Sequence, residues 1–355
     1  MKRIAFIVQL PKKVSPGQRF RFEIYEPILA ANGFQVDTYS FFDIKTYDIL
    51  YKKGKVFVKA LGLLRGIFNR VVLLFKIRSY DYIFLQREFT PLGPPVFEWI
   101  VVKILRCKIV YDFDDAIWIP DRIAEHVFTR WMKCRWKIEY ICKWAYKISV
   151  GNIYLAEFAK QFNSNVFVIP TCVDTEVHHN KLKVHQDGIP VIGWTGSHST
   201  LKYLEIILPV ITKLNKESSF IFQVISNQPP EFSFSNLRFI QWKEDSEIED
   251  LLQIDIGIMP LPDDEWSEGK CGFKLIQYLS LGIPAVASPV GVNKIIMEDG
   301  TNGFLCGNAN VWKIAIQKLL SDSSLRQTMG MAGRKKIEQQ YSISSQKEKF
   351  LALFS

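Results

Sequence analysis

Two lysines flank a glycine at the point where an apolar helix is expected to begin. The segment is EGKCGFKLIQYLSLGIPAVAS, residues 268–288, with Lys270 and Lys274 on either side of Gly272. Apolar residues follow at helical spacing, and Gly282 provides a helix stop. The amino end of a helix is its positive end, so cations there need an anionic neighbour or open solvent. The segment predicts either a diphosphate site or a surface helix with solvated lysines.

A second segment that could hold an anion is GWTGSHSTLKYLEII, residues 193–207. Gly196 joins an expected strand to an expected helix, and Ser197, Ser199 and Thr200 follow it. Their hydroxyl groups can donate to a phosphate, or they can cap the first turn of the helix. The segment therefore predicts a second phosphate contact or, as the plainer alternative, a helix capped by Ser and Thr.

Three carboxylates gather where the expected strand 108–113 ends. The sequence VYDFDDAIW places Asp112, Asp114 and Asp115 within four residues. Neighbouring carboxylates repel one another and raise their pKa values, so a chain that keeps them together needs a reason. A metal ion is one reason, and an aspartyl nucleophile of the kind found in phosphatases is another. Helix capping and solvated loop acids are the plain alternative.

Arginines accompany two further expected strand ends. The loop and helix at 9–33 contain Arg19 and Arg21, and LQREFTP places Arg87 directly after a strand. A guanidinium group can bind a phosphate through two parallel hydrogen bonds, so the three arginines are candidates for acceptor binding. In the alternative interpretation Arg19 and Arg21 face solvent, and Arg87 forms a structural ion pair with Asp112.

The elements that position these residues alternate between short β-rich runs and longer helical runs, such as the helix expected at 21–33. The expected strands are 3–8, 35–41, 82–86, 108–113, 147–152 and 166–170 in the first half, and 191–196, 220–226, 237–242, 256–261 and 284–289 in the second. This alternation predicts parallel sheets with helices on both faces. The expected fold class is α/β, with two doubly wound Rossmann-like domains that face each other across a cleft.

Domain boundaries follow from length and composition. A chain of 355 residues exceeds the usual size of one domain. The polar stretch 178–190 suits a linker, because it ends in Gly-Ile-Pro. We therefore expect an N-terminal domain at 1–180, a C-terminal domain at 181–335 and a final helix at 336–355 that packs back on the N-terminal domain.

The excess of basic over acidic residues is confined to the first half of the chain. Residues 1–180 carry 27 Lys and Arg against 17 Asp and Glu, whereas residues 181–355 carry 18 against 19. Residues 51–80 hold eight basic residues and no acid, and 130–147 add six more. Basic amphipathic helices suit an anionic membrane surface. No nucleic-acid recognition motif accompanies the charge, so nucleic acid is not an expected partner. A packed helix with a solvated basic face is the alternative.

The cysteine, histidine and hydropathy patterns bear on redox state, metal binding and cellular location. The six cysteines form no Cys-x-x-Cys pair and the histidines show no metal-ligand spacing, so we expect reduced thiols and no metal. The start MKRIAFIVQL is expected to be a buried strand rather than a signal peptide. No stretch approaches the ~18 apolar residues of a membrane span. These patterns predict a cytoplasmic protein, peripheral at the inner face of the cell membrane where its basic helices bind.

The two anion segments resemble the donor site of retaining glycosyltransferases of family 4, which have the GT-B fold. The resemblance is specific over residues 190–305, where LGIPAVAS and DGTNGFL match the family at Gly282, Pro284, Asn302 and Gly303. The family's two glutamates are absent: Gly269, beside Glu268, stands at the first position and Gln277 at the second. The segment is more similar to a branch that reads Gly-Lys-Cys-x-x-Lys-x-x-Gln-Tyr.

The resemblance implies an enzyme without metal or cofactor that uses a nucleotide sugar as its donor substrate. It assigns the acceptor to domain 1–180 and the donor to domain 181–335. Asp114 is expected to face the transferred sugar, while Lys270 and Lys274 stabilise the leaving diphosphate. The implied donor-binding residues are Gly17, Gly196, Ser197, Thr200, Lys202, Glu268, Gly272, Phe273 and Gln277, and the candidate acceptor-binding residues remain Arg19, Arg21 and Arg87.

The resulting hypothesis is a retaining glycosyltransferase that acts on an acceptor hydroxyl of a lipid-linked glycan in surface-polysaccharide biosynthesis, such as that of lipopolysaccharide. A nucleotide-sugar 2-epimerase has the same fold but has no need of a basic amphipathic face. A non-catalytic, membrane-associated binding module explains the basic half but leaves the phosphate segments without a role.

Overall fold

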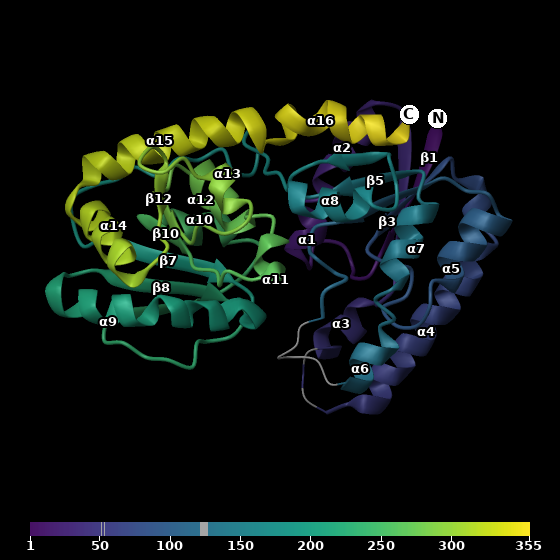
Figure 1. The fold of residues 1–355 in the computed structure, drawn as a ribbon, viewed down its shortest axis with the longest axis horizontal. Helices are drawn as coiled ribbons and strands as arrows, with labels where there is room; N and C mark the ends of the chain where they lie inside the picture. Colours follow the sequence, from purple (N-terminus) through teal and green to yellow (C-terminus); the bar gives the residue numbers. More distant parts are fainter. Residues whose placement is uncertain (51, 53, 121–126) are drawn as a thin grey trace. The chain divides into compact units, whose positions relative to one another are not determined.

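A computed structural model describes residues 1–50, 52, 54–120 and 127–355. Tyr51 and Lys53, which belong to the predicted basic segment, lie outside the described residues. The chain forms two compact units, drawn in Figure 1. Unit 1 comprises residues 1–171 and 346–355, and unit 2 comprises residues 172–345. The chain therefore crosses to unit 2 after Thr171 and returns to unit 1 at Gln346.

Unit 1 is built on a six-stranded sheet in the order β2-β1-β3-β4-β5-β6, whose strands pair in parallel. Its central strands β1, β3 and β4 are largely buried runs rich in Ile, Val, Phe and Tyr, as expected where helices cover both faces of a sheet. The strands are β1 (Lys2–Val8), β2 (Phe34–Ser40), β3 (Tyr82–Gln86), β4 (Ile109–Phe113), β5 (Lys147–Val150) and β6 (Val166–Val168).

The helices of unit 1 include one long helix, α4, and several short ones. They are α1 (Pro16–Arg19), η1 (Glu23–Tyr25), α2 (Glu26–Ala31), α3 (Ile44–Leu50), α4 (Val56–Leu74), η2 (Ile77–Ser79), α5 (Val96–Trp99), η3 (Ile100–Ile104), α6 (Val127–Met132), α7 (Lys137–Trp144), α8 (Ile153–Lys160) and η5 (Ala352–Phe354). The single helix predicted at 21–33 is wrong, because the segment forms η1 and then α2. Pro27 is the reason: it lies in the first turn of α2, and its ring cannot continue a helix from the preceding turn.

Unit 2 contains the second parallel sheet, in the order β12-β11-β10-β7-β8-β9. Its strands are β7 (Val191–Gly196), β8 (Ile221–Ser226), β9 (Leu237–Gln241), β10 (Ile256–Met259), β11 (Ala285–Ala287) and β12 (Gly303–Leu305). Its helices are η4 (His198–Ile206), α9 (Leu208–Glu217), α10 (Glu247–Leu252), α11 (Glu265–Glu268), α12 (Phe273–Ser280), α13 (Asn293–Ile296), α14 (Ala309–Ser321) and α15 (Ser323–Gln340), and α16 (Ile343–Leu351) leads back to unit 1.

Each unit has a hydrophobic core of its own. In unit 1 the rings of Phe6, Phe22 and Phe84 lie with centroids 5.0–5.3 Å apart, and Phe350 from the end of the chain stacks on Tyr25 at 4.0 Å. In unit 2, α9 and α14 pack on one face of the sheet, while α12 packs against β10 and α15 on the other. Figure 1 draws α9 and α12 on opposite sides of this sheet. The predicted α/β fold with two doubly wound domains is confirmed.

Candidate functional site

The two sheets each reverse their strand order at one point, and the predicted site residues follow the strands at those points. In unit 2 the order changes between β7 and β10, and in unit 1 it changes between β1 and β3. Ligands of open parallel sheets bind beyond the carboxyl ends of the strands at such a switch point. In unit 2, Gly196 ends β7 and Lys270 follows β10. In unit 1, Gly17 follows β1 and Arg87 follows β3.

The loop after β7 is tightly packed on the indole of Trp194. A Cβ atom on Gly196 would lie 2.5 Å from Trp194 Cη2, so only glycine fits beside this ring. The expected α-helix after the loop is instead the 3₁₀ helix η4. Ser197 precedes η4 without a side-chain cap: its hydroxyl group lies 2.8 Å from the Ser199 hydroxyl, and Thr200 Oγ1 donates to the Ser197 carbonyl at 3.0 Å. The alternative of a first turn capped by Ser and Thr side chains is therefore wrong, and the second phosphate contact stays a prediction.

Gly272 lies directly before α12 and has the left-handed backbone angle φ +67°, which favours glycine. A Cβ atom there would lie 2.3 Å from Cδ1 of Ile296 on α13. The packing of α13 therefore also favours glycine at this position, and the donor-binding role of Gly272 stays a prediction. The packing of α13 against Gly272 therefore helps to fix the start of α12 and the direction of its first backbone N–H groups.

Two cations stand at the start of α12, each over an aromatic ring. The Lys270 ammonium lies 4.8 Å from the ring centroid of Trp266, and the Lys274 ammonium lies 5.3 Å from that of Trp194. Trp194 thus touches both predicted anion segments, the Gly196 loop and the start of α12. A further link joins them, because the Thr195 N–H donates to the Tyr278 hydroxyl oxygen at 3.0 Å. The structure therefore brings together two segments, 193–207 and 268–288, that have 60 residues between them in the sequence.

Carboxylates around α12 differ from the family pattern. Gln277 is buried and donates to Glu247 Oε1 at 3.2 Å, and the same oxygen accepts from Trp242 Nε1 at 3.2 Å. A buried carboxylate thus lies beside the position where the family has its second glutamate. Glu268 accepts the backbone N–H of Gly291 at 3.2 Å. The donor contacts predicted for Gln277 and Glu268 stay predictions, and each has a partner within the chain.

The remaining donor residues occupy different settings. Lys202 is exposed, with its ammonium 5.6 Å from the ring centroid of Tyr203, and Phe273 is half-buried at the start of α12. Two residues on which the resemblance rests are structural: Asn302 is buried and bonds the backbone of Ile296 and Glu298, while Gly303 packs directly against the Ala285 carbonyl. The contacts shown for these motif residues are therefore with the chain itself, near the β12 edge of the sheet.

Unit 1 pairs its acidic cluster with two arginines. Arg87 Nη2 lies 2.9 Å from Asp115 Oδ2 and 3.3 Å from Asp114 Oδ1. Burial works against the charge of Arg87, but the two carboxylates outweigh it and raise the pKa of this guanidinium. Burial also raises the pKa of Asp114, and Arg87 opposes that rise. Arg87 has φ +64°, which is strained for a residue with a side chain.

Arg21 is corrected from an acceptor ligand to a structural residue. Its guanidinium forms an ion pair with Asp112, donates to Ser149 Oγ at 3.2 Å and bonds the Ile169 carbonyl, and both members of the pair are buried. The alternative interpretation paired Asp112 with Arg87, whose ion pairs are instead with Asp114 and Asp115. Arg19 is half-buried, with its guanidinium 4.8 Å from the ring centroid of Phe20. Its acceptor role stays a prediction, as does that of Arg87.

Gly17 lies against the acidic cluster. A Cβ atom on Gly17 would lie 3.0 Å from Asp114 Oδ2, and the Gly17 carbonyl accepts from Gln86 Nε2 at 3.0 Å. The loop after β1 therefore lies beside the ends of β3 and β4. Gly17, Arg87 and Asp114 form one cluster, which the sequence predicted only as three separate strand ends.

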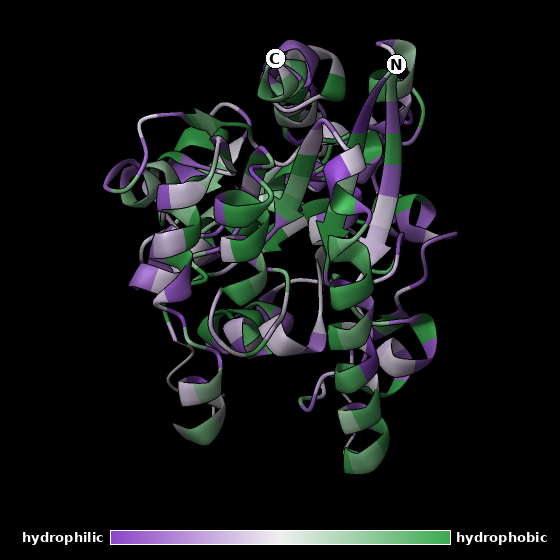
Figure 2. Cartoon of the chain, turned by 90° about the vertical axis from the view of Figure 1, so that its right-hand side faces the viewer, coloured by the Kyte–Doolittle hydropathy of each residue, from purple (hydrophilic) through white to green (hydrophobic). Residues whose placement is uncertain are grey.

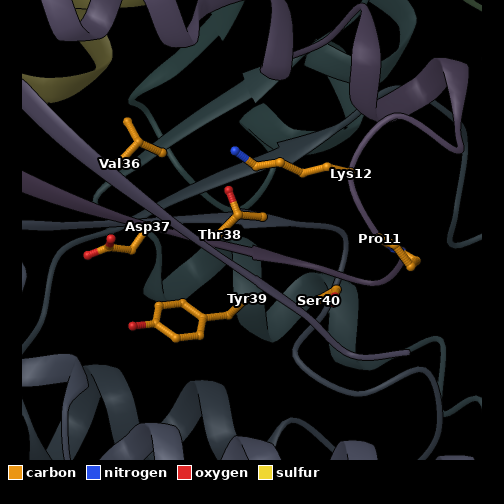
Figure 3. Close-up of a pocket in the computed structure, with 7 residues that line it drawn as sticks. All are labelled: Pro11, Lys12, Val36, Asp37, Thr38, Tyr39 and Ser40. Carbon is orange, nitrogen blue, oxygen red and sulfur yellow. The ribbon is translucent and has the colours of Figure 1, made fainter. Parts of the chain in front are cut away.

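The described residues show a surface hollow but no arrangement suited to a metal ion. No group of three His, Cys, Asp or Glu among them is placed to hold one. In the acidic cluster of unit 1, the guanidinium groups of Arg21 and Arg87 supply the positive charge that a metal ion would otherwise provide. The hollow belongs to unit 1 and lies over β2 and the loop after β1, lined by Pro11, Lys12, Val36, Asp37, Thr38, Tyr39 and Ser40 (Figure 3). Its lining contains none of the predicted site residues.

Two residues in unit 2 were missed by sequence reasoning. Trp194 lies within a buried strand, where an aromatic residue signals only packing. Glu247 lies in KEDSEIED, residues 243–250, where the surrounding acids suggest a solvated helix start. Neither has a local pattern that could have revealed its partner, because Lys274 and Gln277 lie far away in the sequence.

Comparisons with known proteins agree with this arrangement. Residues 189–322 match the family model described as glycosyl transferases group 1. A search of curated proteins finds no match to this chain. Among solved structures, sucrose-phosphate synthase from Thermosynechococcus elongatus is similar, with TM-score 0.72 and 13% identity over 100% of this chain and 98% of that one.

Two further structures are similar over nearly their whole length. HepE from Anabaena, in complex with UDP and glucose, has TM-score 0.67 and 14% identity over 99% of each chain. A glycosyltransferase from Rickettsia africae has TM-score 0.68 and 14% identity over 99% of this chain and 97% of that one. At these identities the likeness establishes the architecture alone. The chain has the two-unit α/β fold of these proteins, and its residues 189–322 match the group 1 glycosyltransferase model.

Proposed function

We propose that the chain is a retaining glycosyltransferase that transfers a sugar from a nucleoside-diphosphate sugar to an acceptor hydroxyl. One observation carries the proposal: the Gly196 loop and the start of α12 flank the switch point of unit 2 and meet at Trp194. The matched family model spans both segments. UDP is the first nucleotide to test, because the Anabaena HepE structures contain UDP or UDP-glucose.

In this proposal the diphosphate binds at the start of α12. Backbone N–H groups and the ammonium groups of Lys270 and Lys274 offset the negative charge that grows on the leaving diphosphate. This use of lysines and amides is the basis for proposing an enzyme that needs no metal. Asp114 of unit 1 stabilises the positive charge that develops on the sugar ring, and Arg87 holds its carboxylate in place.

The acceptor belongs to the same proposal. The basic excess of residues 1–180 favours an anionic acceptor, and we propose a lipid-linked glycan of surface-polysaccharide assembly. The enzyme would then work as a cytoplasmic protein at the inner face of the cell membrane. Among the described residues, no helix has both the length and the apolar character needed to cross a membrane.

The test measures binding and turnover separately. Calorimetry with a panel of nucleoside diphosphates should give binding to one of them, and Lys274→Ala should weaken it about tenfold to a hundredfold, as expected for a lost charge-assisted hydrogen bond. Lys213→Ala, which removes an exposed lysine on α9 of the same unit, is the matched control. Equal affinity in the two variants would refute the site.

Turnover is followed as release of the nucleoside diphosphate in the presence of EDTA. We expect slow hydrolysis of the correct nucleotide sugar by the native protein and none by Asp114→Asn, which should still bind the nucleotide. Inversion at C2 of the free nucleotide sugar would point to an epimerase. Binding without any turnover, with or without candidate acceptors, would point to a non-catalytic module.

A further inference from the structure

Helix α4 carries an apolar stripe that the described part of the chain leaves exposed. Phe57, Leu61, Leu64, Phe68, Val71 and Phe75 follow one another at spacings of four and three residues, so they form one line along the helix. Phe57, Phe68 and Phe75 are 92%, 65% and 85% exposed. Figure 2 colours most of α4 in the green of apolar residues. Exposed apolar surface on this scale marks an interaction site.

The opposite face of α4 is fixed to unit 1. Gly62 and Gly66 allow close approach, because a Cβ atom on either would lie 2.5 Å from Thr46 or Phe41. Arg70 is buried and donates to the carbonyls of Val8, Tyr39 and Phe89 at 2.7–3.0 Å. The helix is therefore held so that its apolar stripe faces outward, and no refolding is needed to present it.

These contacts also place α4 near the candidate site of unit 1. Val8 is the last residue of β1, and Phe89 follows the end of β3. The loops after the same two strands carry Gly17 and Arg87. The hydrogen bonds of Arg70 therefore join α4 to the carboxyl ends of the strands, where the acidic cluster also lies.

The charges around the stripe have one sign. Residues 49–80 contain no Asp or Glu, and Lys52, Lys55, Lys76 and Arg78 are exposed close to the two ends of α4. The guanidinium of Arg65 lies 2.9 Å from the Asp43 carboxylate, so this pair adds no net positive charge around the stripe. A second copy of this helix would bring like charges together, whereas an anionic lipid surface complements them.

We infer that α4 is a docking helix that lies in the plane of an anionic bilayer. Its stripe enters the boundary between headgroups and acyl chains, and its lysines contact lipid phosphates. With 19 residues the helix is about 28 Å long. The contact brings the carboxyl ends of the strands of unit 1, where the proposed acceptor residues lie, to the membrane. The inference rests on the proposed function and deepens it, because it names the surface from which a lipid-linked acceptor is taken.

Vesicle flotation tests the inference without any substrate. The full chain is mixed with vesicles of phosphatidylglycerol and phosphatidylcholine, or of phosphatidylcholine alone. We expect flotation with the first kind only, weakening as salt rises. Phe57→Ser/Phe68→Ser/Phe75→Ser should reduce partitioning about a hundredfold or more. Lys52→Gln/Lys76→Gln should reduce it about thirtyfold.

The matched control is Val177→Ser/Val184→Ser/Ile314→Ser, which replaces three apolar residues of unit 2 that are similarly exposed, and it should float like the native protein. Failure of the native protein to float, equal flotation with both vesicles, or equal loss in the control would overturn the inference. So would a concentration-dependent dimer, seen by light scattering, that the stripe variant abolishes. Calorimetry with UDP on the same variants separates this inference from the donor site, since neither depends on the other.

Discussion

Replacement of Gly272 by alanine tests how tightly the start of α12 is held. The left-handed backbone angle of +67° costs an alanine about 1–2 kcal/mol. Its Cβ would also lie 2.3 Å from Cδ1 of the buried Ile296, and such overpacking costs about 1–3 kcal/mol. We therefore expect Gly272→Ala to lower the free energy of unfolding of unit 2 by about 2–5 kcal/mol.

Gly300 provides the matched control. It has φ +76°, but a Cβ atom there would meet no described residue within 4 Å apart from its chain neighbours, so Gly300→Ala should cost only the backbone part, about 1–2 kcal/mol. Urea unfolding of the two variants, read as midpoints at equal slope, measures the difference. UDP should still stabilise Gly300→Ala, whereas Gly272→Ala should lose most of that stabilisation because the first turn of α12 moves. Equal stability and equal UDP response in the two variants would refute the reasoning.

Three further predictions concern the buried charges of unit 1. Arg21→Met or Asp112→Leu alone should cost about 3–5 kcal/mol in urea unfolding, because each leaves a buried charge without its partner, and the double variant should recover much of the loss; an additive loss would contradict the ion pair. Burial raises the pKa of Glu98 to about 7, above its ordinary value of 4.5, so its stabilising effect is complete below pH 4.5 and is lost as the pH rises through 7. Glu98→Gln should flatten the fall in unfolding free energy over that range, and an unchanged pH profile would exclude Glu98 as the cause. Arg87 lowers the pKa of Asp114, so Arg87→Gln should move the acid limb of the transfer rate to higher pH; a fall in rate with no shift of that limb would contradict the pairing.

The fold could be predicted because its signals are local. Most of the parallel strands are short apolar runs between turn residues, and such a run reveals a strand wherever it lies in the sheet. The helix at 21–33 failed for an equally local reason, the position of Pro27, which was available in the sequence. The 3₁₀ form of η4 has no such signal, because it is set by how the loop packs on Trp194.

The sequence identified the residues of the candidate site by their type, but it did not reveal which other residues pack against them. Gly17, Gly196 and Gly272 were predicted as donor-binding residues, and the structure adds that Asp114, Trp194 and Ile296 lie where a side chain at these positions would go. Those partners lie 97, 2 and 24 residues away, and only the folded chain shows them. Arg21 failed in the same way, since nothing near it in the sequence indicates that Asp112 will be buried beside it. Residue type predicts the available chemistry, and packing decides whether a ligand or the chain uses it.

A crystal structure of the chain with UDP tests the central claim most directly. We expect diphosphate oxygens within about 3.2 Å of the backbone nitrogens that open α12 or of the ammonium nitrogens of Lys270 and Lys274. The nucleotide bound elsewhere, or those groups still engaged only with the chain's own atoms while UDP is bound, would contradict the account.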